Sequence, residues 1–311
     1  MRRDDPRFLP YVGLISAMVL WASSFVALKV AFTAYDPMYV IFGPMFVAAL
    51  CLFPALRRTD HVRYRKGDWK YLLFMGFCEP CLYYIFESQA LMRTSASQAG
   101  MIVAMLPLMT AVAAHFALKE KVGRRAMAGF ALAIVGAVWL SAAAEQTEHA
   151  PAPVLGNVLE FVAMACATGY MVTMKHLSVR YSPVFITALQ ATMGSVFYLP
   201  LLALPTTAQP QGFAMLPFLA ILYLGTFVTI GGYGLYNYGT SKIPVNQSTA
   251  FTNLIPVITL FLGWLLLGET FTAQQYAASA LVLAGVFLSQ ERHPLEEVRE
   301  ERGEPAPHDR A

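Results

Sequence analysis

Long apolar runs separated by short polar loops dominate this sequence. Each run has about 20 residues, the length that an α-helix needs to cross the hydrocarbon core of a membrane. A helix also satisfies its backbone hydrogen bonds within one segment, as lipid requires. The pattern therefore predicts an all-α integral membrane protein with ten transmembrane helices, over about residues 10–32, 36–56, 70–91, 95–117, 125–143, 155–176, 183–204, 214–238, 246–267 and 273–290.

Composition supports this prediction. Of the 311 residues, 57% are hydrophobic and 13% are charged, whereas a soluble protein carries roughly 25% charged residues. No small-residue cleavage site follows the first apolar run, so we interpret it as a first span rather than a cleaved signal peptide.

The loop charges predict an orientation. With ten spans both termini lie on one side, and all 22 Lys and Arg residues except Lys29 and Arg93 fall on that side. Basic loops face the cytoplasm in multi-pass proteins. We therefore predict cytoplasmic termini and an outward-facing acidic stretch at 145–148.

The sequence contains an internal repeat: residues 93–141 resemble residues 242–290, which lie 149 positions later. A slightly shorter shift of 146 aligns the earlier spans. Because five spans is an odd number, the second half must start from the opposite side of the membrane, which predicts inverted repeats around a shared midplane cavity. The matched pairs include Tyr84 with Tyr233, Gln98 with Gln247, Pro107 with Pro256, Thr110 with Thr259, Glu120 with Glu269, Gly136 with Gly285, and, by the shorter shift, Lys29 with Lys175 and Pro37 with Pro183.

The predicted division of the chain follows from these patterns. It comprises a cytoplasmic N-terminus at 1–9, a five-helix repeat at 10–143, an external linker at 144–154, a second repeat at 155–290, and a cytoplasmic tail at 291–311. The tail has too little apolar content to fold, so we expect it to be disordered. Cys78 and Cys81 have the spacing of a redox pair, but a predicted membrane helix favours a packing role.

Short motifs recur in order along both halves of the sequence. They are Trp21-Ala-Ser-Ser-Phe25 with Lys29, Ser95-Ala-Ser-Gln-Ala99, Leu106-Pro107-Leu108, Lys119-Glu120, and the second copies Asn246-Gln-Ser248, Ile255-Pro256 and Gly268-Glu269. Through these motifs the sequence resembles EamA-type proteins of the drug/metabolite transporter superfamily over roughly residues 10–290. The resemblance implies a bacterial inner-membrane carrier that exports amino acids or related metabolites; the superfamily also includes cationic-drug, sugar-phosphate and nucleotide-sugar carriers.

Two carboxyl groups stand out in the predicted third span. On a continuous helix, Glu79, Tyr83 and Glu87 share one face, with the carboxyl groups about 12 Å apart along the axis. Ionisable residues at this depth are costly and normally face protein or a water-filled path. We therefore interpret Glu79 and Glu87 as candidates for proton or cation coupling; the alternative is an interhelical hydrogen bond.

Further polar residues predict the wall of a substrate cavity formed by the first, third, fourth, sixth, eighth and ninth spans. Tyrosine can stack on a ligand and hydrogen-bond to it, although tyrosines near span ends also form interfacial belts. The predicted substrate-binding residues are Trp21, Ser24, Tyr83, Glu87, Gln98, Tyr170, Tyr233, Asn237 and Asn253.

Two matched residue pairs each allow a functional and a structural interpretation. Pro107 and Pro256 free a backbone carbonyl inside a span, so we predict kinks or gates there; the alternative is a curved, packed helix. Lys29 and Lys175 lie near span ends, where a long side chain ordinarily reaches toward the interface; the alternative is binding of a substrate carboxylate.

The motif content favours a carrier over other membrane proteins. The sequence has no His-Glu-x-x-His pair and no Asp within a span, which argues against an intramembrane enzyme. It has no Gly-rich phosphate loop, so we expect no direct use of ATP, and no charged filter repeat of a channel. We predict a secondary carrier working by alternating access, with a small-molecule substrate, no metal, no cofactor and no nucleic-acid partner.

Overall fold

The computed structural model describes residues 8–57, 64–118, 124–148, 150–243 and 245–289, without the side chains of 114–118 and 245–247. Within these ranges the secondary structure is helical, apart from one isolated bridge between Thr147 and Ala150. The predicted tail, most of the N-terminal segment, Glu120 and the side chain of Gln247 lie outside this description.

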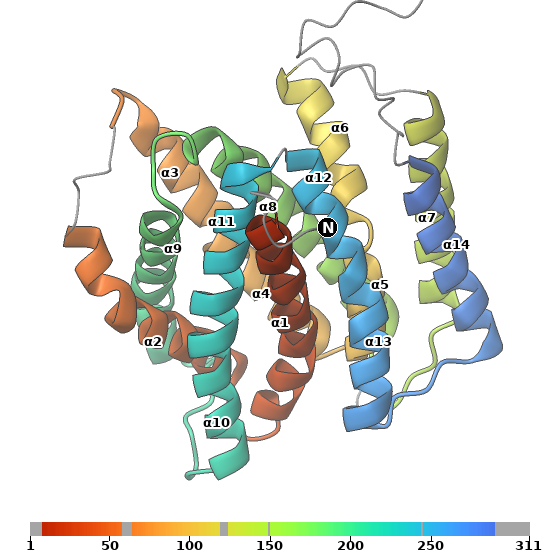
Figure 1. The fold of residues 1–311 in the computed structure, drawn as a ribbon. Coiled ribbons are helices and arrows are strands. Elements are labelled where there is room, and N and C mark those ends of the chain that lie inside the picture. The colour runs from red at the N-terminus through yellow and green to blue at the C-terminus, as the bar shows by residue number, and fades with distance from the viewer. Residues whose placement is uncertain (1–7, 58–63, 119–123, 149, 244, 290–311) are drawn as a thin grey trace, which may run out of the picture.

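Each predicted apolar run coincides with helical structure (Figure 1). In the first half these elements are α1 (Phe8–Phe32), α2 (Pro37–Arg57), α3 (Asp68–Gly76), η1 (Phe77–Leu82), α4 (Tyr83–Leu91), α5 (Ala96–Val103), α6 (Leu106–Leu118) and α7 (Arg124–Ala142). In the second half they are α8 (Pro153–Leu177), α9 (Pro183–Tyr198), η2 (Leu199–Ala203), α10 (Met215–Tyr223), η3 (Leu224–Tyr233), α11 (Gly234–Lys242), α12 (Val245–Ala250), η4 (Phe251–Asn253), α13 (Leu254–Leu267) and α14 (Ala273–Ser289).

In the described part of the chain, eight helical segments are long and apolar enough to cross a membrane. The two other predicted spans are helical but differ in character. The segment 68–91 contains the buried acids Glu79 and Glu87, and α14 has 17 residues. The structure thus contains eight candidate spans, and ten crossings stay a prediction.

Prolines interrupt three of the predicted spans. Proline lacks an N–H and leaves the carbonyl four residues earlier without its helical partner. Accordingly, α5 ends at Val103, four residues before Pro107, and the short turn η4 lies just before Pro256.

The third break corrects the expected continuous face of Glu79, Tyr83 and Glu87. Glu79 has extended backbone angles (φ −147°, ψ 117°) and a cis peptide bond to Pro80. A residue that precedes proline is disfavoured in the α region, so the helix is interrupted at Glu79 and its carboxyl group leaves the stripe.

Helices of the two halves pack across one another rather than within separate bundles. α1 packs against α10, η3, α11 and α13, while α8 packs against α3, η1, α4 and α6. α2 packs against α9. The buried core lies between α1 and α8 and contains Met18, Phe25, Met164 and Met171.

The final helices of the two halves, α7 and α14, lie side by side at one edge of the molecule (Figure 1). Glycines bring their backbones together: a Cβ added at Gly129 would lie 2.5 Å from the carbonyl oxygen of Gly285. Small residues allow such close approach between membrane helices.

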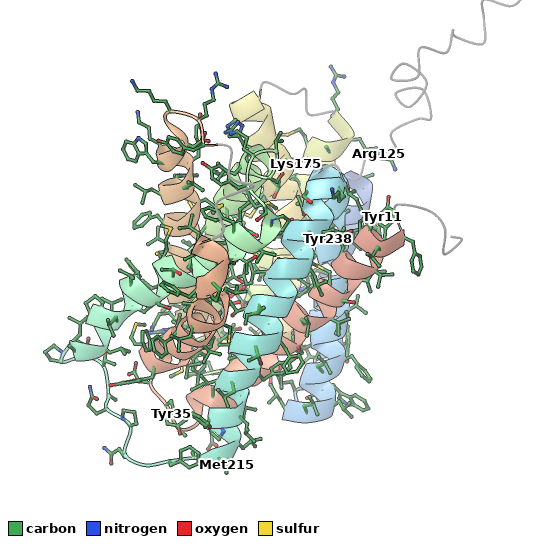
Figure 2. The ribbon with its side chains drawn as sticks, turned by 60° about the vertical axis from the view of Figure 1, so that its left-hand side comes forward. Tyr11, Tyr35, Arg125, Lys175, Met215 and Tyr238 are labelled. Atoms are coloured by element: carbon green, nitrogen blue, oxygen red, sulfur yellow. The ribbon has the colours of Figure 1, made fainter. Side chains whose placement is uncertain are left out.

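Two basic side chains, Arg125 and Lys175, lie toward the same end of the molecule (Figure 2). Figure 2 shows Arg125, Lys175, Tyr11 and Tyr238 toward one end, and Tyr35 and Met215 at the other.

Candidate functional site

A cavity lies among helices of both halves. Its lining is mostly apolar, as in many small-molecule sites. All six spans predicted to form the wall contribute residues, and α2 adds Val40, Ile41, Pro44 and Met45, which the sequence interpretation missed. The predicted residues that line it are Trp21, Ser24, Glu79, Tyr83, Glu87 and Tyr233.

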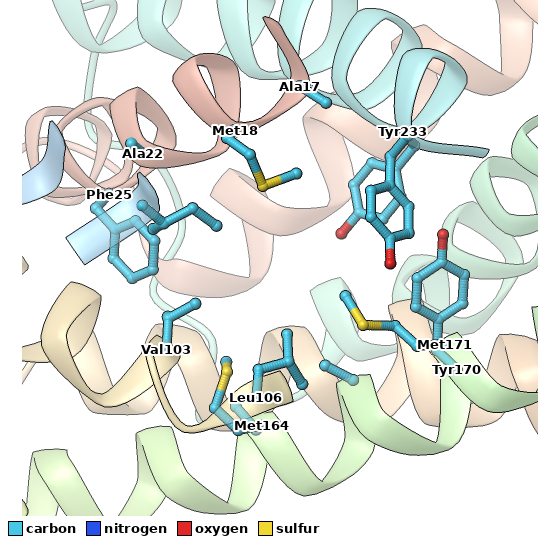
Figure 3. Close-up of a cluster of buried hydrophobic side chains, with 14 of the residues drawn as sticks. Ala17, Met18, Ala22, Phe25, Val103, Leu106, Met164, Tyr170, Met171 and Tyr233 are labelled. Carbon is cyan, nitrogen blue, oxygen red and sulfur yellow. The ribbon is translucent and has the colours of Figure 1, made fainter. Parts of the chain in front are cut away.

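Apolar side chains form one side of this region. Figure 3 shows Phe25 of α1 facing Val103 and Met164, while Tyr170 and Tyr233 stand together at the other end of the cluster. The ring centroids of Tyr170 and Tyr233 are 6.2 Å apart with an edge-to-face geometry. Of these two tyrosines only Tyr233 lines the cavity, where its ring offers a π surface to a ligand.

Glu79, at the break in the third predicted span, is hydrogen-bonded to Tyr233, which is in turn hydrogen-bonded to Tyr84. Its side chain is 4% exposed, and Tyr233 Oη donates a hydrogen bond to Glu79 Oε1. The hydroxyl groups of Tyr84 and Tyr233 lie 2.8 Å apart. Trp21 packs its ring edge-to-face on Tyr233, with centroids 5.1 Å apart, so the carboxyl group lies beside an aromatic wall.

Glu87 forms a second acidic point on the cavity wall. Its side chain is 3% exposed, and Tyr83 Oη donates to Glu87 Oε1 over 2.7 Å. Glu79 and Glu87 interact electrostatically, and the residues that line the cavity include neither Lys nor Arg. This arrangement suits a cationic ligand group better than an anionic one.

Four predicted binding residues lie outside the cavity lining. Tyr170 Oη donates to Asn237 Oδ1 over 2.7 Å, and Asn237 Nδ2 donates to Thr187 Oγ1 over 2.9 Å. Gln98 Oε1 accepts from Asn157 Nδ2 over 2.9 Å. These bonds join helices and give three of the residues a packing function in this conformation. In the described part of the chain, neither amide atom of Asn253 has a hydrogen-bond partner.

Sequence analysis missed a third buried acid, Glu160 of α8. Its side chain has no exposed surface, and Glu87 interacts with it electrostatically. The rule that singled out Glu79 and Glu87, an acid within an apolar span, applies equally to Glu160 in the predicted span 155–176.

The two lysines, predicted to reach toward the interface, donate to carbonyl oxygens at helix ends. Lys29 Nζ donates to Thr94 O over 2.6 Å. Lys175 Nζ donates to Thr240 O over 2.9 Å and to Ile243 O over 3.1 Å. The last carbonyls of a helix lack partners within it and favour cations, so both side chains stabilise helix termini.

A polar cluster precedes the third predicted span. Asp68 pairs with Arg180, at 2.8 Å between Oδ1 and Nη2, and accepts from Tyr181 Oη over 3.1 Å. Burial opposes the charge of Asp68, but hydrogen bonds from Arg65 N, Arg180 and Tyr181 outweigh it and lower the pKa of this carboxyl group.

Among the described residues, no group of three or more His, Cys, Asp or Glu side chains has the arrangement of a metal site. Cys78 and Cys81 are both free.

The pattern of the EamA-like transporter family matches residues 9–142 and again residues 154–290. The chain belongs to the EamA-like transporter family. The resemblance indicated by the short motifs is thereby confirmed, and the chain is a multi-pass membrane transporter rather than a member of an enzyme family.

Several relatives of this EamA-like protein carry transporter names. It is 26% identical to the uncharacterized transporter YetK of Bacillus subtilis, over 92% of each chain. It is 27% identical to a probable terminal-alkyne amino-acid exporter of Streptantibioticus cattleyicolor, over 90% of this chain and 93% of that protein. It is 26% identical to a probable amino-acid metabolite efflux pump of Salmonella typhimurium, over 88% and 91%.

A solved crystal structure shares the fold of this family member. It superposes with a TM-score of 0.64 and 18% identity, covering 90% of this chain and 96% of the other.

Proposed function

We propose that this chain is a secondary-active carrier that exports amino acids or related small metabolites across the bacterial inner membrane by alternating access. The observation that carries the proposal is a cavity between the halves whose aromatic wall holds two buried carboxyl groups, Glu79 and Glu87. Two relatives named for amino-acid or amino-acid metabolite export support the substrate class.

Matched contacts in the two halves support inverted repeats. Lys29 binds Thr94 O; the shift of 146 aligns Lys29 with Lys175, the shift of 149 aligns Thr94 with Ile243, and Lys175 binds Ile243 O. The shift of 146 converts Tyr181 with Asp68 into Tyr35 with Ala214, again with both pairs in contact. A pseudo-two-fold axis explains these pairs, and such symmetry makes inward-open and outward-open states counterparts of each other.

The contact between Tyr84 and Tyr233 supports the same axis. These residues are repeat partners 149 positions apart, and their hydroxyl groups are bonded to each other. A residue meets its own symmetry partner only where the axis passes between them. The axis then runs beside Glu79, at the cavity.

Ten spans with both termini in the cytoplasm fit the charge pattern. Nearly all Lys and Arg residues fall in the termini or in the loops assigned to one side, which the positive-inside rule places in the cytoplasm. Arg125 and Lys175, assigned to that side, lie toward the same end of the molecule (Figure 2).

The lining favours a substrate with an ammonium group. Glu87 would receive that group, while Trp21 and Tyr233 contact its carbon skeleton; Glu79 or Glu87 could hold a coupling proton. A larger organic cation is the second candidate, because aromatic faces also attract cations. A nucleotide sugar fits less well, because the lining contains no Lys or Arg to bind its phosphates.

Transport by purified protein in liposomes tests this function. We expect uptake or exchange of at least one radiolabelled amino acid from a panel, with a rate that responds to an imposed pH gradient. Activity toward an organic cation but no amino acid would favour the second candidate. Turnover in neither assay would contradict the proposal.

Glu87→Gln tests the site, because it keeps the shape of the side chain and removes its charge. We expect a loss of roughly tenfold or more in transport, the size of a lost charge-assisted hydrogen bond of about 1.5–3 kcal/mol. Gln89→Ala is the matched control on the same helix: Gln89 bonds to Arg93 and is not part of the cavity lining. Wild-type transport by Glu87→Gln would remove this carboxyl group from the mechanism.

A further inference from the structure

Glu160 lies in α8, a candidate membrane span, with no exposed surface. In the part of the chain that the structure describes, neither of its carboxyl oxygens has a hydrogen-bond partner. A buried ionised carboxylate without donors carries the full cost of losing its hydration, whereas a neutral carboxyl group does not. The surroundings of Glu160 therefore favour a bound proton.

The nearest amide on the same helix face cannot relieve this cost. Asn157, one turn before Glu160, donates to Gln98 Oε1 over 2.9 Å and to Ser141 Oγ over 3.0 Å. It also accepts from Thr94 Oγ1 over 2.8 Å. Both amide hydrogens of Asn157 are engaged, so it has no donor to spare.

The ionisable groups that act on Glu160 come from the helix packed along it. α4 packs against α8 and brings Glu87 and Tyr83 within electrostatic reach of Glu160. Glu87 and Tyr83 line the cavity, whereas Glu160 is not among the lining residues. Two neighbouring carboxylates without a cation between them do not both ionise, so a proton on Glu160 makes a charge on Glu87 less costly.

The other groups around α8 include no cation that bonds to Glu160 among the described residues. α5 and α12 contain no ionisable residue, and η1 contributes Cys78, Glu79 and Cys81. α6 contains His115, whose side chain lies outside the description. Two cations lie near the segment that contacts Asn157: Lys29 donates to Thr94 O, and Arg93 bonds to Gln89. The remaining ionisable groups of these neighbours are Tyr84 of α4, Asp68, Lys70 and Tyr71 in the first turn of α3, Arg124 and Arg125 at the start of α7, and Tyr236, Tyr238 and Lys242 of α11.

The other half has no such pair. The shift of 146 places Leu14 at the position of Glu160, and the shift of 149 places Tyr236 at that of Glu87. α1 packs on α11 as α8 packs on α4, and Leu14 contacts α11 near Gly239. The acid pair is therefore a property of one interface and is not required by the repeated architecture.

We propose that Glu160 is the proton-holding partner of Glu87: Glu160 keeps a proton, which lets Glu87 carry the negative charge that faces the cavity. When Glu160 releases its proton to water, its O–H bond breaks, the electron pair stays on the carboxylate, and the two adjacent charges repel. Glu160 is a positioning residue, and this inference rests on the proposed function only where it invokes a cationic substrate.

Infrared spectroscopy of the purified protein in lipid, without substrate, tests the proton directly. We expect wild-type protein at neutral pH to show absorption from protonated carboxyl groups, part of which is lost in Glu160→Gln. Glu269→Gln is the matched control: backbone N–H groups of Ala96 and Ser97 donate to Glu269 over 2.8 Å each, as to an ionised carboxylate. Full retention of the absorption in Glu160→Gln would overturn the proposal.

Transport of an amino acid accepted by the wild type tests the role of the proton. Gln resembles a protonated Glu, so Glu160→Gln should stay within about threefold of wild type with a flattened pH profile. Glu160→Leu, which is also uncharged and loses no hydrogen bond, should likewise stay within about threefold of wild type. A larger loss in either variant, or an unchanged pH profile in Glu160→Gln, contradicts the proposed role. If no amino acid is transported at all, the infrared result still decides the protonation of Glu160 independently.

Discussion

The interface between α4 and α8 and its counterpart between α11 and α1 have the same packing but different chemistry. Each joins the first helix of one half to the third predicted span of the other. The α4–α8 interface contains Glu87 and Glu160, whereas Tyr236 and Leu14 occupy the equivalent places in α11 and α1. The shared helix packing therefore does not require the two acids, which are present at only one of the two interfaces.

The positions that match between halves serve helix ends and close packing. Lys29 and Lys175 bind terminal carbonyls, and Gly136 and Gly285 lie where helices meet. The buried acids have no matches. We infer that matched positions build the scaffold, apart from the cavity-lining pair Tyr84 and Tyr233, and that the unmatched buried acids bind substrate and protons. Substitutions at scaffold positions and at the acids should therefore behave differently.

The largest change in stability is expected when the residues of the two interfaces are exchanged, with Glu at position 14 or Leu at position 160. Leu14→Glu places an unpartnered acid in a membrane helix, at a cost of roughly 3 kcal/mol, so we expect little folded protein. Glu160→Leu removes a buried group that lacks a partner and should leave stability unchanged or raised. The Tm and folded yield of both purified variants measure this, and equal losses would contradict the difference between the interfaces.

Close contacts between α7 and α14 should respond equally in both halves. A Cβ at Gly285 would lie 2.5 Å from Ala133 N, and one at Gly136 would lie 2.7 Å from Val282 N. We expect Gly136→Ala and Gly285→Ala each to destabilise the protein by about 1–3 kcal/mol, measured by unfolding in detergent. Gly234→Ala is the control, because a Cβ there meets nothing within 4 Å; clearly unequal losses at the two test positions would argue against symmetry.

Removing either helix-end lysine should cost somewhat less. Lys29→Met and Lys175→Met keep the apolar stem and lose hydrogen bonds from a charged group, for which we expect about 1.5 kcal/mol each. Thermal unfolding checks this against Lys66→Met, whose side chain is exposed. Unchanged Tm in both variants would show that these bonds do not stabilise the helix ends.

The smallest change in stability is expected at Asp68, which lies outside the predicted spans and has Ala214 as its counterpart in the other half. Because the folded state lowers the pKa of Asp68, its contribution is present above the unfolded value of about 3.9 and is lost as pH falls through the folded value. The Tm of Asp68→Asn should lie below that of wild type at neutral pH and approach it in acid. Glu145→Gln, at an exposed position, should show no such convergence; parallel profiles for wild type and Asp68→Asn would contradict the assignment.

Hydropathy and spacing predicted the helical segments closely, because a run of apolar residues constrains a membrane helix more strongly than a soluble one. The breaks near Pro107 and Pro256 follow from the chemistry of proline alone. Tyr83, Glu87 and Tyr233 were selected by depth and polarity and do line the cavity.

Other features depended on tertiary contacts that no local pattern encodes. The interruption at Glu79 could have been read from Pro80, but the pairing of Glu79 with Tyr233 joins residues 154 positions apart. Gln98, Tyr170 and Asn237 have the polarity of ligand-binding residues, yet they bond to other helices. Only the three-dimensional packing distinguishes a polar side chain that bonds to a neighbouring helix from one that lines the cavity.

The bond between Tyr84 and Tyr233 has a consequence for motion. If the two halves exchange conformations around the proposed two-fold axis, each contact between them must be replaced by the contact between the symmetry-related residues. A contact between two symmetry partners is its own counterpart, and so it can persist while its surroundings change. These two hydroxyl groups would then form a fixed point around which the halves move.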